Sequence, residues 1–156
     1  MNVEENSLWL IGAGPMSVDY ARVLDALVVG YSVVGRSKRS ALTFKEVTGK
    51  TVQAGGVSSA IESSTAPETA IVSVGIEQLA RTAGLLIDAG TKRILLEKPG
   101  GLNSGELRGL CSRALERGVI VMIAYNRRFY ASTLKALELI RLDGGVTSCC
   151  FECTEW

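Results

Sequence analysis

The chain has 156 residues, which is the size of one domain with a substantial core and leaves no room for a second full domain. Hydrophobic residues make up 47%, charged residues 21%, and the formal net charge is +1, so the composition gives no electrostatic basis for binding nucleic acid or a membrane surface. The first residues are polar and acidic and no apolar run approaches the length of a bilayer span, so we expect a cytoplasmic protein without a signal peptide.

The chain opens with the pattern of a strand, a glycine turn and a helix. Residues 8–11 are apolar, residues 12–17 read Gly-Ala-Gly-Pro-Met-Ser, and residues 16–28 carry apolar side chains at helical spacing. This arrangement suits a dinucleotide, because Gly12 permits a tight turn, Gly14 lets the backbone approach a pyrophosphate, and free N–H groups at the helix start attract the anion. The sequence therefore predicts a nucleotide-binding turn; the alternative is a tight turn without a ligand.

The rest of this turn fits the same interpretation. Pro15 suits the first helical position, and we expect Pro15 and Met16 to help hold the pyrophosphate. Ser17 stands at the third position of the fingerprint, where Gly or Ala is usual, because this residue sets how closely the helix and the strand pack. Serine is small enough to be accepted there.

Short apolar runs alternate with helical patterns along most of the chain. Strands are predicted at 8–11, 31–34, 51–53, 70–74, 93–96 and 119–124, and helices at 16–28, 38–48, 77–88, 104–117 and 131–142, with one more short helix around 57–63. Gly30, Gly49, Gly90 and Gly118 stand where helices should stop. The alternation predicts an α/β fold, a Rossmann-type doubly wound parallel sheet, with its ligand crevice at the carboxyl ends of the strands.

The segment after the second predicted strand is basic. Gly35 is followed by Arg36, Ser37, Lys38 and Arg39, where a dinucleotide-binding protein often has an acidic residue for the ribose hydroxyls. Arg36 suits a 2′-phosphate because a guanidinium can make two parallel contacts, and Ser37 can both cap the next helix and bond a phosphate oxygen. We therefore expect NADP(H) rather than NAD(H), bound through Arg36, Ser37 and Lys38; a solvated basic loop is the alternative.

An apolar strand at 93–96 runs directly into Glu97-Lys98-Pro99 and a pair of glycines. At the crevice edge, Lys98 could hydrogen-bond a nicotinamide ribose and a substrate hydroxyl, and partial loss of water would suit it to moving a proton. The alternative is a surface lysine that pairs with Glu97.

Together these segments resemble the glucose-fructose oxidoreductase / inositol dehydrogenase family, Gfo/Idh/MocA, which combines an N-terminal nucleotide fingerprint with a Glu-Lys-Pro motif after a later strand. Residues 125–129, Tyr-Asn-Arg-Arg-Phe, are similar to a third segment of that family. The resemblance runs from about residue 7 to the last residue. It implies an NAD(P)-dependent dehydrogenase that transfers hydride between nicotinamide and a sugar, sugar-nucleotide or cyclitol substrate, with Lys98 as the catalytic, substrate-binding residue.

The resemblance also implies supporting roles around the same crevice. Glu97 supports Lys98 beside the cofactor, and Pro99 shapes the turn, in family members through a cis peptide bond. Asn126 is expected at the cofactor, and Tyr125 and Arg127 at the substrate. The neighbouring residues 128 and 129 could equally serve packing or lie on the surface.

The sequence departs from the family at two points. Val74 and Gly75 end the fourth predicted strand where the family commonly has Thr-Pro, followed by a histidine, so we expect only backbone contacts from them to the cofactor. The chain also contains no histidine at all, although histidine is the usual base for taking a hydroxyl proton. Lys98 is then the candidate base that remains in this chain.

The last residues do not follow the alternation. Residues 146–156 are predicted to form a strand that begins a C-terminal substrate domain, after a nucleotide-binding domain at 1–145. Cys149, Cys150 and Cys153 fall in this run, but without a second ligand pair or a histidine they do not predict a metal centre, and small apolar strand residues are the expected role.

Two functions therefore remain open from the sequence. The first is the nucleotide-binding part of an oxidoreductase, inactive alone, whose sugar-like substrate is bound with the help of a second domain. The second is a free-standing, non-enzymatic NADP(H)-binding module, a sensor or partner subunit. In that case the final strand could pair with a second copy and form a homodimer.

Overall fold

The computed structural model describes residues 8–150 and 152 and divides the chain into two compact units, Met1–Ala124 and Tyr125–Trp156. The first unit contains the strands β1 (Leu8–Ile11), β2 (Ser32–Gly35), β3 (Val52–Ala54), β4 (Thr69–Val72), β5 (Arg93–Leu96) and β6 (Ile120–Ile123). Its helices are α1 (Pro15–Ala26), α2 (Lys38–Thr48), α3 (Gly56–Ser63), α4 (Ile76–Asp88) and α5 (Ser104–Arg117).

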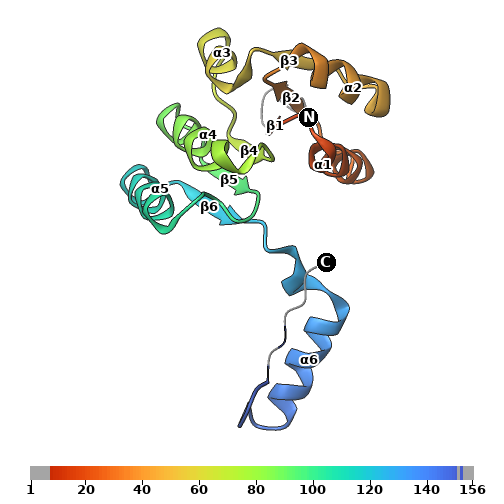
Figure 1. The fold of residues 1–156 in the computed structure, drawn as a ribbon, viewed down its shortest axis with the longest axis vertical. Coiled ribbons are helices and arrows are strands. Elements are labelled where there is room, and N and C mark those ends of the chain that lie inside the picture. Colours follow the sequence, from red (N-terminus) through yellow and green to blue (C-terminus); the bar gives the residue numbers. More distant parts are fainter. Residues whose placement is uncertain (1–7, 151, 153–156) are drawn as a thin grey trace. The chain divides into compact units, whose positions relative to one another are not determined.

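The described strands form one parallel sheet in the order β3-β2-β1-β4-β5-β6 (Figure 1). The predicted doubly wound α/β sheet is thus confirmed, as is the short extra helix, which is α3. The chain moves outward from β1 through β2 to β3 and then returns to place β4 on the other side of β1. The order therefore reverses between β1 and β4, which is where open parallel sheets hold their ligands.

Alternate residues of the strands build a hydrophobic core on each face of the sheet. Trp9 and Ile11 of β1 belong to the larger core, which includes buried side chains of α3, α4 and α5. Leu10 points the other way and packs in a smaller core with Ala21 of α1 and Phe44 of α2. Both faces are buried, which explains why the strands read as nearly continuous apolar runs.

Most helix ends follow the residues that the sequence offers. Ser37 caps α2 by accepting a hydrogen bond from the Ser40 N–H at 3.1 Å, and Asn103 caps α5 in the same way. Gly49 and Gly118 end these two helices in the left-handed conformation, as predicted.

The end of α1 differs from the prediction, because Gly30 does not stop the helix. The helix ends at Ala26, and Val28 takes the left-handed position with a φ of 56°. The Val29 N–H then bonds the Leu24 carbonyl at 3.0 Å, which closes the end of the helix. A β-branched residue is strained in this conformation, and the Val28 side chain is 91% exposed, so little packing offsets the strain.

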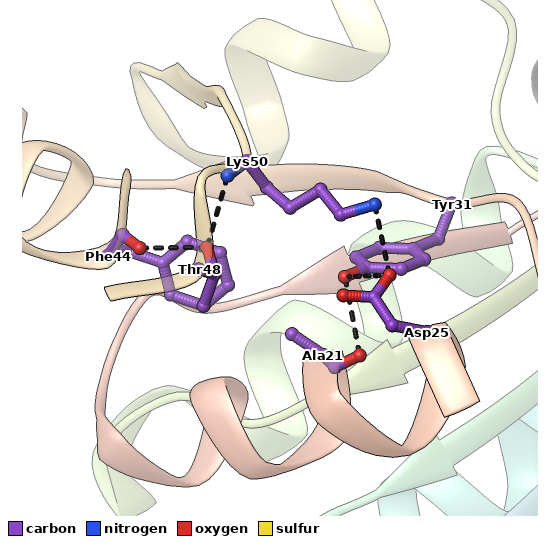
Figure 2. A network of polar contacts seen from close by, with 6 residues as sticks. All are labelled: Ala21, Asp25, Tyr31, Phe44, Thr48 and Lys50. Carbon is purple, nitrogen blue, oxygen red and sulfur yellow. Dashed lines mark hydrogen bonds and ion pairs between the residues drawn. The ribbon is translucent and has the colours of Figure 1, made fainter. Parts of the chain in front are cut away.

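A polar cluster of Asp25, Tyr31 and Lys50 lies at the amino-terminal edge of the sheet (Figure 2). The Lys50 Nζ atom lies 2.9 Å from Asp25 Oδ1 and 5.1 Å from the centre of the Tyr31 ring. The Tyr31 hydroxyl donates to Asp25 Oδ1 at 3.2 Å. Burial, followed by the charge of Asp25 and this hydrogen bond, raises the pKa of Tyr31 to about 12. The cluster thereby joins the end of α1 to the segments that lead into β2 and β3.

The second unit contains a 3₁₀ helix, η1 (Asn126–Phe129), and the helix α6 (Ala131–Leu142). The Thr133 hydroxyl donates to the Arg127 carbonyl at 3.0 Å and so fixes the junction between them. None of the described residues of α6 is buried in the structure, and several of its leucines are exposed. The division after Ala124 groups α6 with η1, whereas the sequence places the domain boundary after residue 145; that boundary stays a prediction.

The predicted strand at 146–156 lies partly outside the described residues, because residues 151 and 153–156 are not among them. Residues 146–150 and 152 are irregular, and Cys149 and Cys150 are exposed with free thiols. A strand requires a neighbouring strand for its backbone hydrogen bonds, and none pairs with these residues in the described part of the chain. A strand that completes another sheet or pairs with a second copy stays a prediction.

We predict that Val28→Gly stabilises the protein by about 1 kcal/mol, because glycine adopts the left-handed conformation without strain. Val47→Gly is the matched control, since Val47 is an exposed valine in the last turn of α2, where the backbone is helical. There the same change should lower the free energy of unfolding by about 0.5 kcal/mol. Urea denaturation of the three proteins measures both effects. A loss of stability in Val28→Gly would contradict the assignment of strain.

We also predict a loss of stability in alkali that depends on Tyr31. A tyrosine whose pKa rises on folding stabilises the folded state below its unfolded pKa, near 10, and this contribution disappears as the pH approaches about 12. Urea midpoints measured across that range should fall more steeply in the wild type than in Tyr31→Phe. Parallel curves would show that the Tyr31 hydroxyl does not retain its proton more strongly in the folded state.

Candidate functional site

A cavity of about 750 Å³ opens at the carboxyl ends of β1, β2 and β4. Its walls come from the turns that follow these strands, from the start of α3 and from one side of α4. It is lined by Ile11, Gly12, Ala13, Gly14, Val34, Gly35, Arg36, Ser37, Ser40, Gly55, Gly56, Val57, Ser58, Ser73, Val74, Gly75, Glu77, Gln78, Arg81, Thr82 and Leu85. This is the edge at which the sequence predicts a ligand crevice.

The first turn of the site packs directly against the end of β4. Gly12 has a φ of +129°, and a Cβ atom there would lie 2.3 Å from the Ser73 carbonyl oxygen and 2.7 Å from Ser17 Oγ. Only glycine fits at this contact. Ser17 is fully buried, and its Oγ lies 2.7 Å from Ser73 Oγ, so the two hydroxyls form a buried hydrogen bond. The third fingerprint position therefore does more than keep a small volume: its hydroxyl ties α1 to β4.

Gly14 faces open space in the same turn. It is the N-cap residue of α1, and a Cβ atom there would have no neighbour within 4 Å. Pro15 begins the helix, as predicted, and no described side chain caps this helix start. The first N–H groups of α1 therefore lack a side-chain acceptor, which is the arrangement that binds an anion at a helix start.

The second wall follows β2 and is basic. Gly35 is buried, and a Cβ atom at this position would lie 2.8 Å from Val52 Cγ1, so a larger residue would require Val52 to move. Arg36 is exposed at the rim and forms no ion pair with a described residue. Ser37 and Ser40 lie beside it with their hydroxyl oxygens 2.6 Å apart. This wall offers a guanidinium, two hydroxyl groups and no carboxylate.

The turn after β5 carries the Glu-Lys-Pro motif. The Lys98–Pro99 peptide bond is cis, as the family resemblance implies. The Tyr20 hydroxyl, from α1, donates to Glu97 Oε1 at 2.6 Å, and the Lys98 N–H donates to Glu97 Oε2 at 3.2 Å. Burial, then the hydrogen bond with Glu97 and its charge, raise the pKa of Tyr20 far above its usual range. Lys98 itself is exposed, and no described residue forms an ion pair with it, so the alternative of a Glu97–Lys98 pair is not what the structure shows.

The structure brings only some of the predicted site residues together around the cavity. Those that line it are Gly12, Gly14, Arg36, Ser37, Val74 and Gly75. Pro15, Met16 and Lys38 are exposed in the first turns of α1 and α2, next to lining residues, while Glu97 and Lys98 lie on the turn after β5. Tyr125, Asn126 and Arg127 belong to the second unit. The roles assigned to all of them stay predictions.

Other lining residues were not found from the sequence. They are Ser40, the segment 55–58 at the start of α3, and the residues Gln78, Arg81, Thr82 and Leu85 of α4. The adjacent glycines Gly55 and Gly56, both with positive φ, were a usable signal for a turn at the crevice. The residues of α4 lie along one side of the helix, but nothing in their types distinguishes them from other helical residues.

No family model and no curated protein matches the sequence of this chain. Solved structures do match it, and they support the fold. Among solved structures, GenD2 from gentamicin A biosynthesis in complex with NAD is 28% identical, with a TM-score of 0.75 over 88% of this chain. The chain has the fold of the N-terminal domain of the Gfo/Idh/MocA oxidoreductases.

Two further Gfo/Idh/MocA-type structures agree with the fold. The WlbA dehydrogenase from Chromobacterium violaceum, in complex with NADH and UDP-GlcNAcA, has a TM-score of 0.76 at 10% identity over 91% of this chain. Biliverdin reductase from Synechocystis sp. PCC 6803, in complex with biliverdin and NADP⁺, has a TM-score of 0.70 at 17% identity over 87% of this chain. The chain spans 39%, 41% and 44% of the length of GenD2, WlbA and biliverdin reductase, respectively.

Residues 8–150 and 152 contain neither a metal-ligand cluster nor a membrane-spanning helix. No cluster of three or more potential metal ligands occurs there. No helix in that part of the chain combines the length and the apolar character needed to cross a bilayer.

We predict that the two glycines of the first turn respond differently to the same substitution. Gly12→Ala should destabilise the protein by about 3 kcal/mol, because the new methyl group meets the Ser73 carbonyl and the backbone conformation is unfavourable. Gly14→Ala places its methyl group in open space and should cost about 1 kcal/mol or less. Chemical denaturation of both variants tests this difference. Equal losses would contradict the close contact at Gly12.

Proposed function

We propose that the first unit binds NADP(H) and forms the nucleotide-binding part of an NAD(P)-dependent oxidoreductase. The observation that carries this proposal is the composition of the cavity walls. One wall is a glycine turn at an uncapped helix start, and the other presents Arg36, Ser37 and Ser40 without a carboxylate. The similar structures are described as complexes with NAD, NADH and NADP⁺, which supports a nicotinamide dinucleotide as the ligand.

The residues present fit such a ligand. The open space at Gly14 leaves room for a pyrophosphate beside the first N–H groups of α1. Val74 and Gly75, at the carboxyl end of β4, line the same cavity and offer backbone groups. Arg36 is free to make paired contacts with a 2′-phosphate, and the hydroxyl groups of Ser37 and Ser40 stand beside it. An acidic residue that would repel this phosphate is absent from that wall among the described residues.

The dinucleotide supplies the hydride chemistry when it is bound. The contribution of the chain is to orient the ligand, with the glycine turn at the pyrophosphate and the basic wall at the adenosine ribose. Lys98 then holds the reacting oxygen of the substrate by donating a hydrogen bond and takes part in moving its proton. The substrate class we propose is a sugar, sugar nucleotide or cyclitol, and the similarity to WlbA, whose complex includes UDP-GlcNAcA, favours it. Tyr125 and Arg127 are the proposed substrate contacts, and Asn126 the cofactor contact.

A second candidate is an NADP(H)-binding module that does not catalyse a reaction. The absence of histidine from the sequence favours it, because the usual general base for oxidising a hydroxyl group is missing from this chain. Both candidates require nucleotide binding, and substrate turnover distinguishes them. A chain completed by a substrate-binding domain would oxidise a sugar-like substrate only under the first candidate.

We predict that the chain binds NADPH more tightly than NADH and that Arg36 carries the difference. Arg36→Ala should weaken NADPH binding about 10- to 100-fold and change NADH binding about threefold or less, because the guanidinium contacts only the 2′-phosphate. Arg39→Ala is the matched control, since Arg39 is an exposed arginine of the same segment that does not line the cavity. It removes the same charge and should change neither affinity by more than about threefold.

Titration followed by nicotinamide fluorescence measures these affinities. Equal affinity for the two nucleotides in the wild type would overturn the NADP(H) preference while leaving the nucleotide site intact. Failure to bind either nucleotide would overturn the proposed function of the isolated chain.

A further inference from the structure

The turn that carries Lys98 is fixed at its backbone. The Gly100 N–H donates to the Glu97 carbonyl at 2.9 Å and closes the turn after β5. Gly100 is buried with a φ of +90°, and a Cβ atom there would lie 2.7 Å from Ile123 Cδ1 in β6. The backbone of this turn therefore packs tightly against the neighbouring strand. The backbone of Lys98 is therefore held in place, while its side chain remains exposed.

The carboxylate next to Lys98 accepts hydrogen bonds from two other donors. Glu97 Oε1 accepts from the Tyr20 hydroxyl at 2.6 Å, and Glu97 Oε2 accepts from the Lys98 backbone N–H at 3.2 Å. Each oxygen thus has a donor, and the Lys98 ammonium group is not one of them. Without these two donors, an exposed lysine beside a glutamate would be expected to form an ion pair with it.

The residue that holds Glu97 comes from the helix that begins at the glycine turn. Tyr20 lies three residues after Ser17, so both are on the same side of α1. Ser17 joins the helix to the end of β4, and Tyr20 joins it to the end of β5. A tyrosine hydroxyl is protonated at neutral pH. The raised pKa of Tyr20 extends this state further into alkali, so the hydroxyl remains a donor to the Glu97 carboxylate.

We propose that Tyr20 is a positioning residue for Lys98: its hydroxyl holds the Glu97 carboxylate away from the Lys98 ammonium group and leaves that group free for a ligand. The hydrogen bond also couples the nucleotide-binding turn at the start of α1 to the turn that carries Lys98. The use of Lys98 for a reacting oxygen rests on the proposed function. Whether Glu97 and Lys98 form an ion pair in the free chain does not depend on that function, and it can be tested without any nucleotide.

Removing the Tyr20 hydroxyl changes the partners of Glu97 in a defined way. Tyr20→Phe keeps the ring that packs against the smaller core and removes only the donor. The part-buried Glu97 Oε1 then lacks a hydrogen-bond partner. Because an unpaired, partly buried carboxylate oxygen is unfavourable, a new donor should replace the lost hydroxyl. The Lys98 ammonium is carried by the next residue in the chain and is unpaired among the described residues. The variant should therefore form the Glu97–Lys98 pair that the wild type does not.

Acetylation of Lys98 by an N-hydroxysuccinimide ester, followed by mass spectrometry of the digested chain, measures how free this amine is. We expect Lys98 in Tyr20→Phe to react about two- to fivefold more slowly than in the wild type, because pairing with the part-buried Glu97 carboxylate stabilises the charged amine. Lys92, an exposed lysine before β5 that forms no ion pair with a described residue, is the internal reference and should react at an unchanged rate. An unchanged or faster reaction of Lys98 would overturn the proposal.

A double-mutant comparison shows whether the effect passes through Glu97. In a Glu97→Gln background the neutral amide cannot pair with the ammonium group, so adding Tyr20→Phe should leave the reaction of Lys98 unchanged. A slower reaction in that background would assign the effect to a general structural change and overturn the proposal. Thermal unfolding of each variant confirms that the chain remains folded.

A second measurement remains valid if Tyr20→Phe does not fold. In Glu97→Gln, absorbance titration of the tyrosines should show Tyr20 ionising at a lower pH than in the wild type, because the carboxylate that stabilises its protonated form is gone. An unchanged titration would show that Tyr20 and Glu97 are not coupled in solution, which also overturns the proposal. Neither readout depends on nucleotide binding, so its failure is distinct from failure of the proposed function.

Discussion

The close contact between Gly12 and the end of β4 is the constraint on which the site depends. A glycine without a Cβ atom lets the first turn lie against the Ser73 carbonyl, and the buried hydroxyl pair of Ser17 and Ser73 holds it there. This contact fixes the direction in which α1 leaves the sheet. It thereby determines where the uncapped start of the helix points and where Tyr20, one turn further along, reaches Glu97.

The parts of the fold that could be predicted from the sequence are those set by local patterns. Apolar runs and helical spacing predicted each strand and helix of the first unit, because both faces of a parallel sheet must be buried. Gly49 and Gly118 marked helix ends correctly, since their conformations favour glycine. The end of α1 could not be predicted this way, because Val28 accepts a strained conformation that no local preference indicates.

Only part of the candidate site could be predicted from the sequence, because the remaining site residues lie far apart along the chain. The glycine turn and the basic segment are contiguous motifs, and the structure places both at the cavity. Gln78 and Thr82 line its opposite wall only because the sheet order brings α4 there, and their residue types carry no signal of their own. The contact between Tyr20 and Glu97 joins residues 77 positions apart, so it too required the fold.

The polar cluster of Asp25, Tyr31 and Lys50 lies at the edge of the sheet opposite the cavity. Substitutions that strengthen or weaken that cluster change how firmly α1 is fastened to the sheet without adding or removing a cavity-lining group. Natural selection can therefore adjust the stability of this chain at one edge of the sheet and its ligand preference at the other, with little effect of either change on the other property. The same separation offers a protein engineer a place to offset the cost of a destabilising change in specificity.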